Sequence, residues 1–119
     1  MNTQKPTPAS RRRALARQAR DAFPPMGVFT IRNLSTGSVR VRASRHVPGA
    51  INRMGFELRQ GSHTDKTLQA EWSAQGPDGF EIAVVEMVKE RDDPAFDYTA
   101  ELTLLHALYT AELATGARA

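Results

Sequence analysis

Residues 26–44 read MGVFTIRNLSTGSVRVRAS, and this stretch decides the fold because it predicts two strands joined by a tight turn. Apolar and polar residues alternate around Phe29 in the first half, and valine alternates with arginine in the second half. Such alternation is the pattern of a half-buried strand. Gly37 supplies the turn, so a β-hairpin is expected with strands over residues 26–33 and 39–44.

A helix is predicted over residues 48–61, directly after this hairpin. Proline is tolerated in the first turn of a helix and glycine commonly ends one, and Pro48 and Gly61 occupy those two places. A second helix is expected to begin at the capping residue Thr64 and to end at Gly76. Apolar residues recur at spacings of three and four in both segments, which gives each helix one buried face.

Residues 80–88 predict a third strand, whose alternation gives way to a continuous apolar run. Such a run is typical of a strand covered on both faces, so we expect this strand at the centre of the sheet. Asp93-Pro94 is expected to open a last helix with an apolar stripe that ends near Leu113. The order strand, strand, helix, helix, strand, helix predicts one α+β domain over residues 26–115, with a small three-stranded sheet flanked by helices.

Residues 1–25 precede this domain as a basic extension, which is expected to be disordered or marginally helical. The net charge of +3 conceals an asymmetry, because residues 1–25 carry +5, residues 26–70 carry +5 and the remainder carries −7. A basic surface concentrates polyanions. Nucleic acid is therefore one candidate partner, and an ordinary solvated surface is the competing interpretation.

The absence of cysteine excludes disulfides, a thiolate nucleophile and cysteine-type zinc sites. No apolar run approaches the roughly 20 residues that cross a bilayer, so we expect no membrane contact. These features predict a cytoplasmic protein. The arginine-rich, nearly acid-free start also leaves an organelle transit peptide open.

This pattern resembles the GIY-YIG nuclease family. Gly27-Val28-Phe29 resembles the first family motif, and residues 39–44 occupy the place of the second, with Arg40, Val41 and Arg42 at its three named positions. The stretch from Val47 to Trp72, with Asn52-Arg53, Phe56-Glu57-Leu58-Arg59 and Gly61-Ser62-His63, looks like a subgroup of small, stand-alone bacterial members, as does Asp93-Pro94-Ala95-Phe96-Asp97-Tyr98.

For an active member, the resemblance implies cleavage of a phosphodiester with a divalent cation such as Mg²⁺, using two tyrosines, a helix arginine and a glutamate on the last helix. The corresponding positions here are Phe29, Arg40, Ala50 and His106. None of the four carries the implied functional group, since phenylalanine lacks a hydroxyl and magnesium prefers oxygen ligands to histidine nitrogen. We therefore expect a catalytically degenerate domain with no intact catalytic residue, no metal site and no cofactor.

Three functions remain open on these grounds. The first is nucleic-acid binding, to DNA or RNA, through a basic surface made of Arg32, Arg40, Arg42, Arg45 and Arg53. The second is a divergent metal-dependent endonuclease in which Arg53, Glu101 or Glu112 substitute for the missing groups. The third is a protein-interaction or regulatory module that uses the N-terminal basic segment or the last helix.

Overall fold

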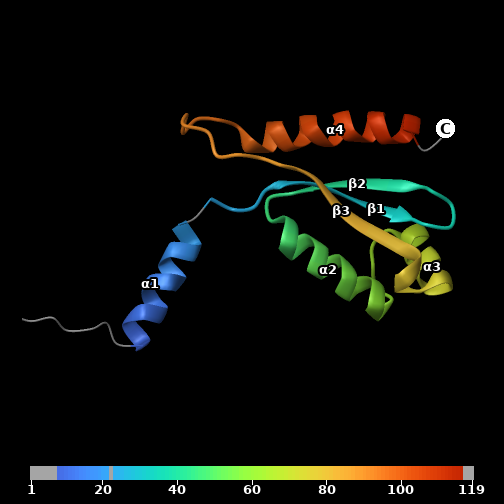
Figure 1. Cartoon of the computed structure of the whole chain (residues 1–119), viewed down its shortest axis with the longest axis horizontal. Coiled ribbons are helices and arrows are strands. Elements are labelled where there is room, and N and C mark those ends of the chain that lie inside the picture. The colour runs from blue at the N-terminus through green and yellow to red at the C-terminus, as the bar shows by residue number, and fades with distance from the viewer. Residues whose placement is uncertain (1–7, 22, 117–119) are drawn as a thin grey trace, which may run out of the picture.

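The computed structural model describes residues 8–21 and 23–116 (Figure 1). The elements in chain order are α1 (Pro8–Asp21), β1 (Gly27–Asn33), β2 (Val39–Ser44), α2 (Val47–Gln60), α3 (Lys66–Gln75), a short 3-10 turn (Pro77–Gly79), β3 (Phe80–Met87) and α4 (Tyr98–Gly116). The predicted α+β fold is confirmed, with the three strands and the flanking helices in the expected order.

The sheet has the strand order β2-β1-β3, and both pairings are antiparallel. The prediction that the third strand is central is therefore wrong, because β1 holds that place. The apolar run in β3 has another cause. The pairing shifts between Val28 and Phe29, whose partners are Glu86 and Val84, so Val85 is an extra bulged residue. Val84 is 50% exposed, as expected of an edge strand rather than a buried one.

Helices cover both faces of the sheet, which gives three layers with α4 on one face and α2 and α3 on the other (Figure 1). The core beneath α4 contains Met26, Val28, Val41, Val88, Leu102 and Leu105. The core beneath α2 and α3 contains Phe29, Ile31, Val47, Met54, Leu58 and Leu68. Because successive residues of a strand point to opposite faces, β1 contributes to both cores.

Two helices begin later than the sequence predicts, and in both cases an aspartate is the cap. Asp65 accepts a hydrogen bond from the backbone N–H of Leu68, so α3 is capped by Asp65 and not by Thr64. Asp97 accepts from the backbone N–H of Ala100 at the start of α4. The predicted opening residue Asp93 instead closes a turn before α4.

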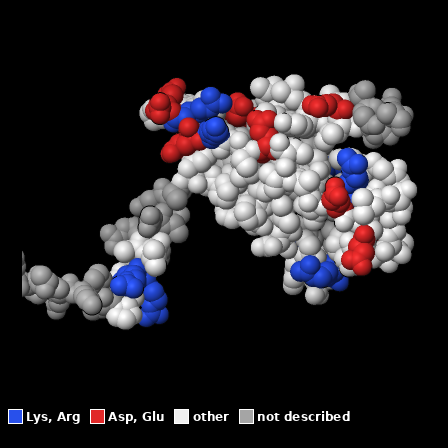
Figure 2. Space-filling model, viewed as in Figure 1, with Lys and Arg blue, Asp and Glu red and all other residues white. Residues whose placement is uncertain are grey.

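The helix α1 extends away from the sheet, and the basic side chains of its first half lie apart from the body (Figure 2). Arg11, Arg12 and Arg13 are exposed, and the first turn of α1 holds no acidic residue. Among the described residues, no helix combines the length and apolar character needed to span a bilayer.

Gly27 is the glycine whose replacement tests this packing most directly. A Cβ at Gly27 would lie 2.3 Å from the backbone oxygen of Glu86, where no flexible side chain can move aside. We expect Gly27→Ala to lower the free energy of unfolding by about 1–3 kcal/mol, measured by urea denaturation. Gly55→Ala in α2 is the control, because its Cβ would meet only the mobile end of Arg59, and the higher helix propensity of alanine is expected to raise stability. Equal effects at both glycines would contradict the close approach of β1 and β3.

Candidate functional site

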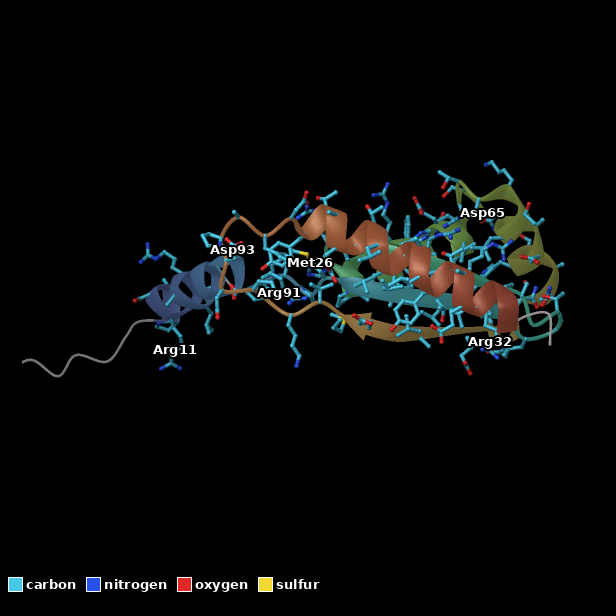
Figure 3. The ribbon with its side chains drawn as sticks, turned by 90° about the horizontal axis from the view of Figure 1, so that it is seen from above. Arg11, Met26, Arg32, Asp65, Arg91 and Asp93 are labelled. Atoms are coloured by element: carbon cyan, nitrogen blue, oxygen red, sulfur yellow. The ribbon has the colours of Figure 1, made fainter. Side chains whose placement is uncertain are left out.

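The register of the hairpin separates the arginines that the sequence grouped together. Arg40 pairs with Ile31 and Arg42 pairs with Phe29, so both arginines lie on the face that packs against α2 and α3. Arg32 pairs with Val39 and lies on the opposite face. Figure 3 shows Arg32 well away from Asp65, the partner of the other two arginines. The structure therefore does not bring Arg32 into a cluster with Arg40 and Arg42.

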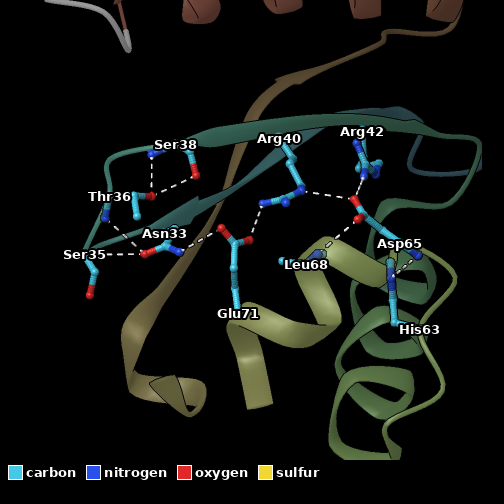
Figure 4. A network of polar contacts seen from close by, with 10 residues as sticks. All are labelled: Asn33, Ser35, Thr36, Ser38, Arg40, Arg42, His63, Asp65, Leu68 and Glu71. Carbon is cyan, nitrogen blue, oxygen red and sulfur yellow. Dashed lines mark hydrogen bonds and ion pairs between the residues drawn. The ribbon is translucent and has the colours of Figure 1, made fainter. Parts of the chain in front are cut away.

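Acidic residues of α3 and its cap neutralise Arg40 (Figure 4). Its Nε donates to Oδ2 of Asp65 at 3.1 Å, and its Nη1 lies 2.9 Å from Oε2 of Glu71. The side chain of Arg40 is only 18% exposed. The other oxygen of Glu71 accepts from the side-chain amide of Asn33, a fully buried residue that also caps the hairpin turn. Arg40 therefore joins the hairpin to α3, and two carboxylates offset its charge.

Asp65 is the centre of this network because its two oxygens serve different partners. One oxygen accepts from the backbone N–H of Leu68, and the other accepts from Arg40 and from Nη2 of Arg42 at 3.2 Å. The hydrogen bond from Leu68, followed by the two arginines, holds the pKa of the Asp65 carboxyl below its ordinary value of 3.8, against the opposing effect of partial burial. The carboxylate thus stays charged to a lower pH than an ordinary aspartate does.

A pocket of about 200 Å³, named the α2 pocket below, lies beside Arg42 between β2 and α2. It is lined by Phe29, Arg42, Ala43, Ser44, Ala50, Arg53, Met54, Glu57 and His63. Arg53 is 81% exposed and forms an ion pair with Glu57 one helical turn away, with 3.4 Å between Nε and Oε2. Glu57 is the one carboxylate in the lining, against two guanidinium groups.

His63 is a buried member of the α2 pocket, and its ring is held in one tautomer. Its Nδ1 accepts a hydrogen bond of 3.0 Å from the backbone N–H of Asp65, so the neutral ring carries its proton on Nε2. Its own backbone N–H donates to the side chain of Gln69. The loop before α3 therefore fixes His63 as well as Arg42, and both side chains depend on Asp65.

Two solved structures share this three-layer arrangement, although no family model and no curated protein matches the chain. One is a mutant of the catalytic domain of intron endonuclease I-TevI, with 19% identity over 75% of this chain and 84% of that chain and a TM-score of 0.62. The other is the catalytic domain of homing endonuclease I-TevI, with 20% identity over 74% and 87% and a TM-score of 0.61. The chain has a GIY-YIG-like fold. Identities this low establish a shared fold and carry no statement about activity.

Within this GIY-YIG-like fold, two of the four positions that the resemblance singles out meet at one place. Phe29 and Ala50 both line the α2 pocket, together with Arg53. Arg40 lies on the same sheet face but in the acidic network described above. His106 lies on the other face, where α4 packs. The structure thus brings Phe29 and Ala50 together and places Arg40 and His106 elsewhere.

His106 lines a second pocket of about 430 Å³ between β2 and α4, named the β2–α4 pocket. Its lining comprises Arg42, Ala43, Ser44, Arg45, Thr99, Leu102, Thr103 and His106. Nε2 of His106 donates to the backbone carbonyl of Val41 at 3.0 Å, and Arg42 donates to the same oxygen. His106 is therefore engaged with the edge of β2, as a packed edge-of-core histidine would be. Arg45 donates to the hydroxyl of Thr99.

Glu101 and Glu112 are the acids that would substitute for missing catalytic groups in a divergent endonuclease. Neither residue lines the α2 pocket or the β2–α4 pocket. Within residues 8–21 and 23–116, no group of three or more histidine and acidic side chains is placed to hold a metal ion.

The two tyrosines are also engaged away from the α2 pocket. Tyr109 donates to Glu86, which raises the pKa of the Tyr109 hydroxyl above its ordinary value of 10.0, and Tyr98 accepts from the backbone of Arg91.

Sequence reasoning assigned no role to Glu57 and His63, which are ionisable members of the α2 pocket. Glu57 follows Ala50 by seven residues and Arg53 by four, so helical spacing alone places it on their side of α2. This spacing in the sequence could therefore have identified Glu57. His63 has no such signal, because it lies in a loop whose path is set by hydrogen bonds to Gln69 and Asp65.

Asp65→Asn tests whether the charge of Asp65 stabilises this network. Asparagine still caps a helix, so the substitution removes the charge and keeps a cap acceptor. We expect the free energy of unfolding to fall by about 1 kcal/mol at neutral pH, measured by urea denaturation. Asp78→Asn, at an exposed residue of the 3-10 turn, is the matched control and should change little.

The pH dependence of this difference follows from the lowered pKa of Asp65. Because the folded pKa lies below 3.8, the contribution is complete above that pH and is lost as the pH falls through the folded value. The stabilities of wild type and Asp65→Asn should therefore converge in acid. A difference that persists unchanged at low pH would show that the charge is not the cause.

Proposed function

We propose that this chain is a nucleic-acid-binding domain of GIY-YIG-like fold whose catalytic positions are degenerate, and that the α2 pocket receives a phosphate group. The observation that carries the proposal is the composition of one pocket. Phe29 and Ala50 line it without a hydroxyl or a charge, while Arg42 and Arg53 line it with guanidinium groups. The lining is thus suited to holding a phosphate and lacks the family's acid–base groups.

The hydrogen-bonding groups of the α2 pocket favour an anion. The guanidinium groups of Arg42 and Arg53 and the Nε2–H of His63 are donors, and the hydroxyl of Ser44 can donate as well. Arg42 uses one N–H group for Asp65 and one for the carbonyl of Val41, which leaves further N–H groups for a ligand. Phosphate oxygens accept bidentate hydrogen bonds from arginine with good geometry.

A divalent cation fits these residues poorly. Magnesium is commonly held through one or two carboxylates together with substrate phosphates. Here the one carboxylate, Glu57, already faces Arg53, and a cation would have to displace that partner and lie beside two guanidinium groups. The α2 pocket is therefore unsuited to a catalytic step that depends on a metal.

Arg53→Glu tests the α2 pocket as the binding site, with Arg59→Glu as a control of identical charge change on the same helix outside the pocket. We expect Arg53→Glu to lower the affinity for labelled DNA or RNA oligonucleotides about tenfold at low salt, because a carboxylate then faces the phosphate. Gel-shift titrations across a salt series measure this, and wild-type affinity should fall steeply with salt. Equal losses in both variants, or no binding at low salt, would overturn the proposal.

The competing function is a divergent metal-dependent endonuclease, and its support is that Glu57 and His63 share the α2 pocket with Arg53. The proposed degenerate domain predicts that single-stranded and duplex oligonucleotides remain intact on incubation with Mg²⁺ or Mn²⁺, as judged by denaturing gels. Cleavage that requires the cation and disappears in Glu57→Gln would establish the endonuclease instead. The substitution keeps the size of the side chain and removes only its charge.

A protein-interaction module is the third candidate, and the outer face of α4 supports it. Leu104 and Leu108 lie one turn apart on α4 and are 54% and 55% exposed. Association through such a surface is apolar and is not weakened by salt in the way that phosphate contacts are. The salt series described above therefore separates this function from nucleic-acid binding.

A further inference from the structure

We infer that a single nucleic-acid strand crosses the edge of β2, with one phosphate in the α2 pocket and another in the β2–α4 pocket. This inference rests on the proposed function and specifies the path and the form of the ligand. The two pockets have three consecutive residues in common, Arg42, Ala43 and Ser44. Since these residues belong to an edge strand, no further strand separates the pockets from solvent at that edge.

The chemistry of the β2–α4 pocket suits a second phosphate. Its lining contains the guanidinium groups of Arg42 and Arg45 and the hydroxyls of Ser44 and Thr99, and among the described residues no carboxylate lines it. The hydroxyl of Thr103, also in the lining, already donates to the backbone carbonyl of Thr99. Residues 71–119, which include α4, carry a net charge of −7, yet none of their described carboxylates lines this pocket. The acids of α4, Glu101 and Glu112, are both outside the pocket. Arginine and hydroxyl donors are the groups that contact phosphates in protein–nucleic-acid interfaces.

The edge of β2 is a poor place for a peptide strand to add to the sheet. Strand addition needs free backbone carbonyls and N–H groups along the edge. At Val41, the middle of β2, the carbonyl already accepts from His106 and from Arg42. A ligand that contacts side chains rather than the backbone ladder fits this edge better, and a nucleic-acid strand is such a ligand.

The arrangement favours a single strand over a duplex. Figure 1 shows α2 and α3 on one face of the sheet and α4 on the other. Residues of α2 line the α2 pocket and residues of α4 line the β2–α4 pocket, so the two pockets lie toward opposite faces. A ligand that occupies both must turn around the strand edge. Duplex DNA has a persistence length of about 150 base pairs and bends this sharply only at a high cost in free energy, whereas a single strand is flexible.

Thr103→Glu and Thr110→Glu form the matched pair for the test. Both threonines are exposed on α4, and they lie two turns apart on the same side of the helix. Only Thr103 lines the β2–α4 pocket. Arg45→Gln is a second variant, which removes a charge from the pocket without adding one. Fluorescence anisotropy is measured with single strands of about ten nucleotides, with the corresponding duplex and with a dinucleotide.

We expect Thr103→Glu to weaken binding of the longer single strand about tenfold, Arg45→Gln to weaken it severalfold, and Thr110→Glu to leave it within about twofold. The dinucleotide has one bridging phosphate and cannot fill both pockets at once, so Thr103→Glu should weaken its binding less than it weakens binding of the longer strand. Wild type should bind the single strand more tightly than the duplex.

Equal losses in Thr103→Glu and Thr110→Glu, or equal affinity for single strand and duplex, would overturn this inference. A preserved effect of Arg53→Glu in the same experiment would leave the proposed function intact. Absence of binding by the wild type would overturn both.

Discussion

The central position of β1 is the constraint on which the rest of the structure depends. β1 is hydrogen-bonded on both edges, to β2 and to β3, and helices cover both of its faces. Val28 and Ile31 are fully buried on its opposite faces. A strand held in this way cannot slip by one residue, because a slip would exchange the two cores. Its register therefore also fixes which arginines of β2 face α2 and α3.

The sequence predicted the elements of this fold well and their burial less well. Helix stripes, the turn at Gly37 and the end of α2 at Gly61 are local signals, and the structure confirms them. The central strand was misplaced because an apolar run in β3 is typical of a buried strand, while here a bulge at Val85 and an open edge produce the same pattern. Hydrophobicity alone does not distinguish these two situations.

Neighbours within one element could be predicted from the sequence, whereas contacts between distant elements could not. Ala50 and Arg53 both lie on α2 and both line the α2 pocket, as their helical spacing predicts. The neutralisation of Arg40 was not visible, because its partner Asp65 is 25 residues away and is brought near only by the packing of α3 on the sheet. An ion pair at such a separation leaves no periodic signal in the sequence.

Arg42 and Arg53 of the α2 pocket are both partly neutralised, which affects how the proposed binding of a polyanion would work. Asp65 forms an ion pair with Arg42, and Glu57 forms one with Arg53. Each carboxylate partly offsets the positive charge of its partner, which weakens the attraction of that guanidinium group for an anion. Exposed charge pairs in water contribute little individually. In the proposed function, affinity for a polyanion would therefore come from several modest phosphate contacts made at once, since linked contacts reinforce one another. Arg42 belongs to both pockets, which makes the edge of β2 the place in this fold where such contacts can be joined along one chain.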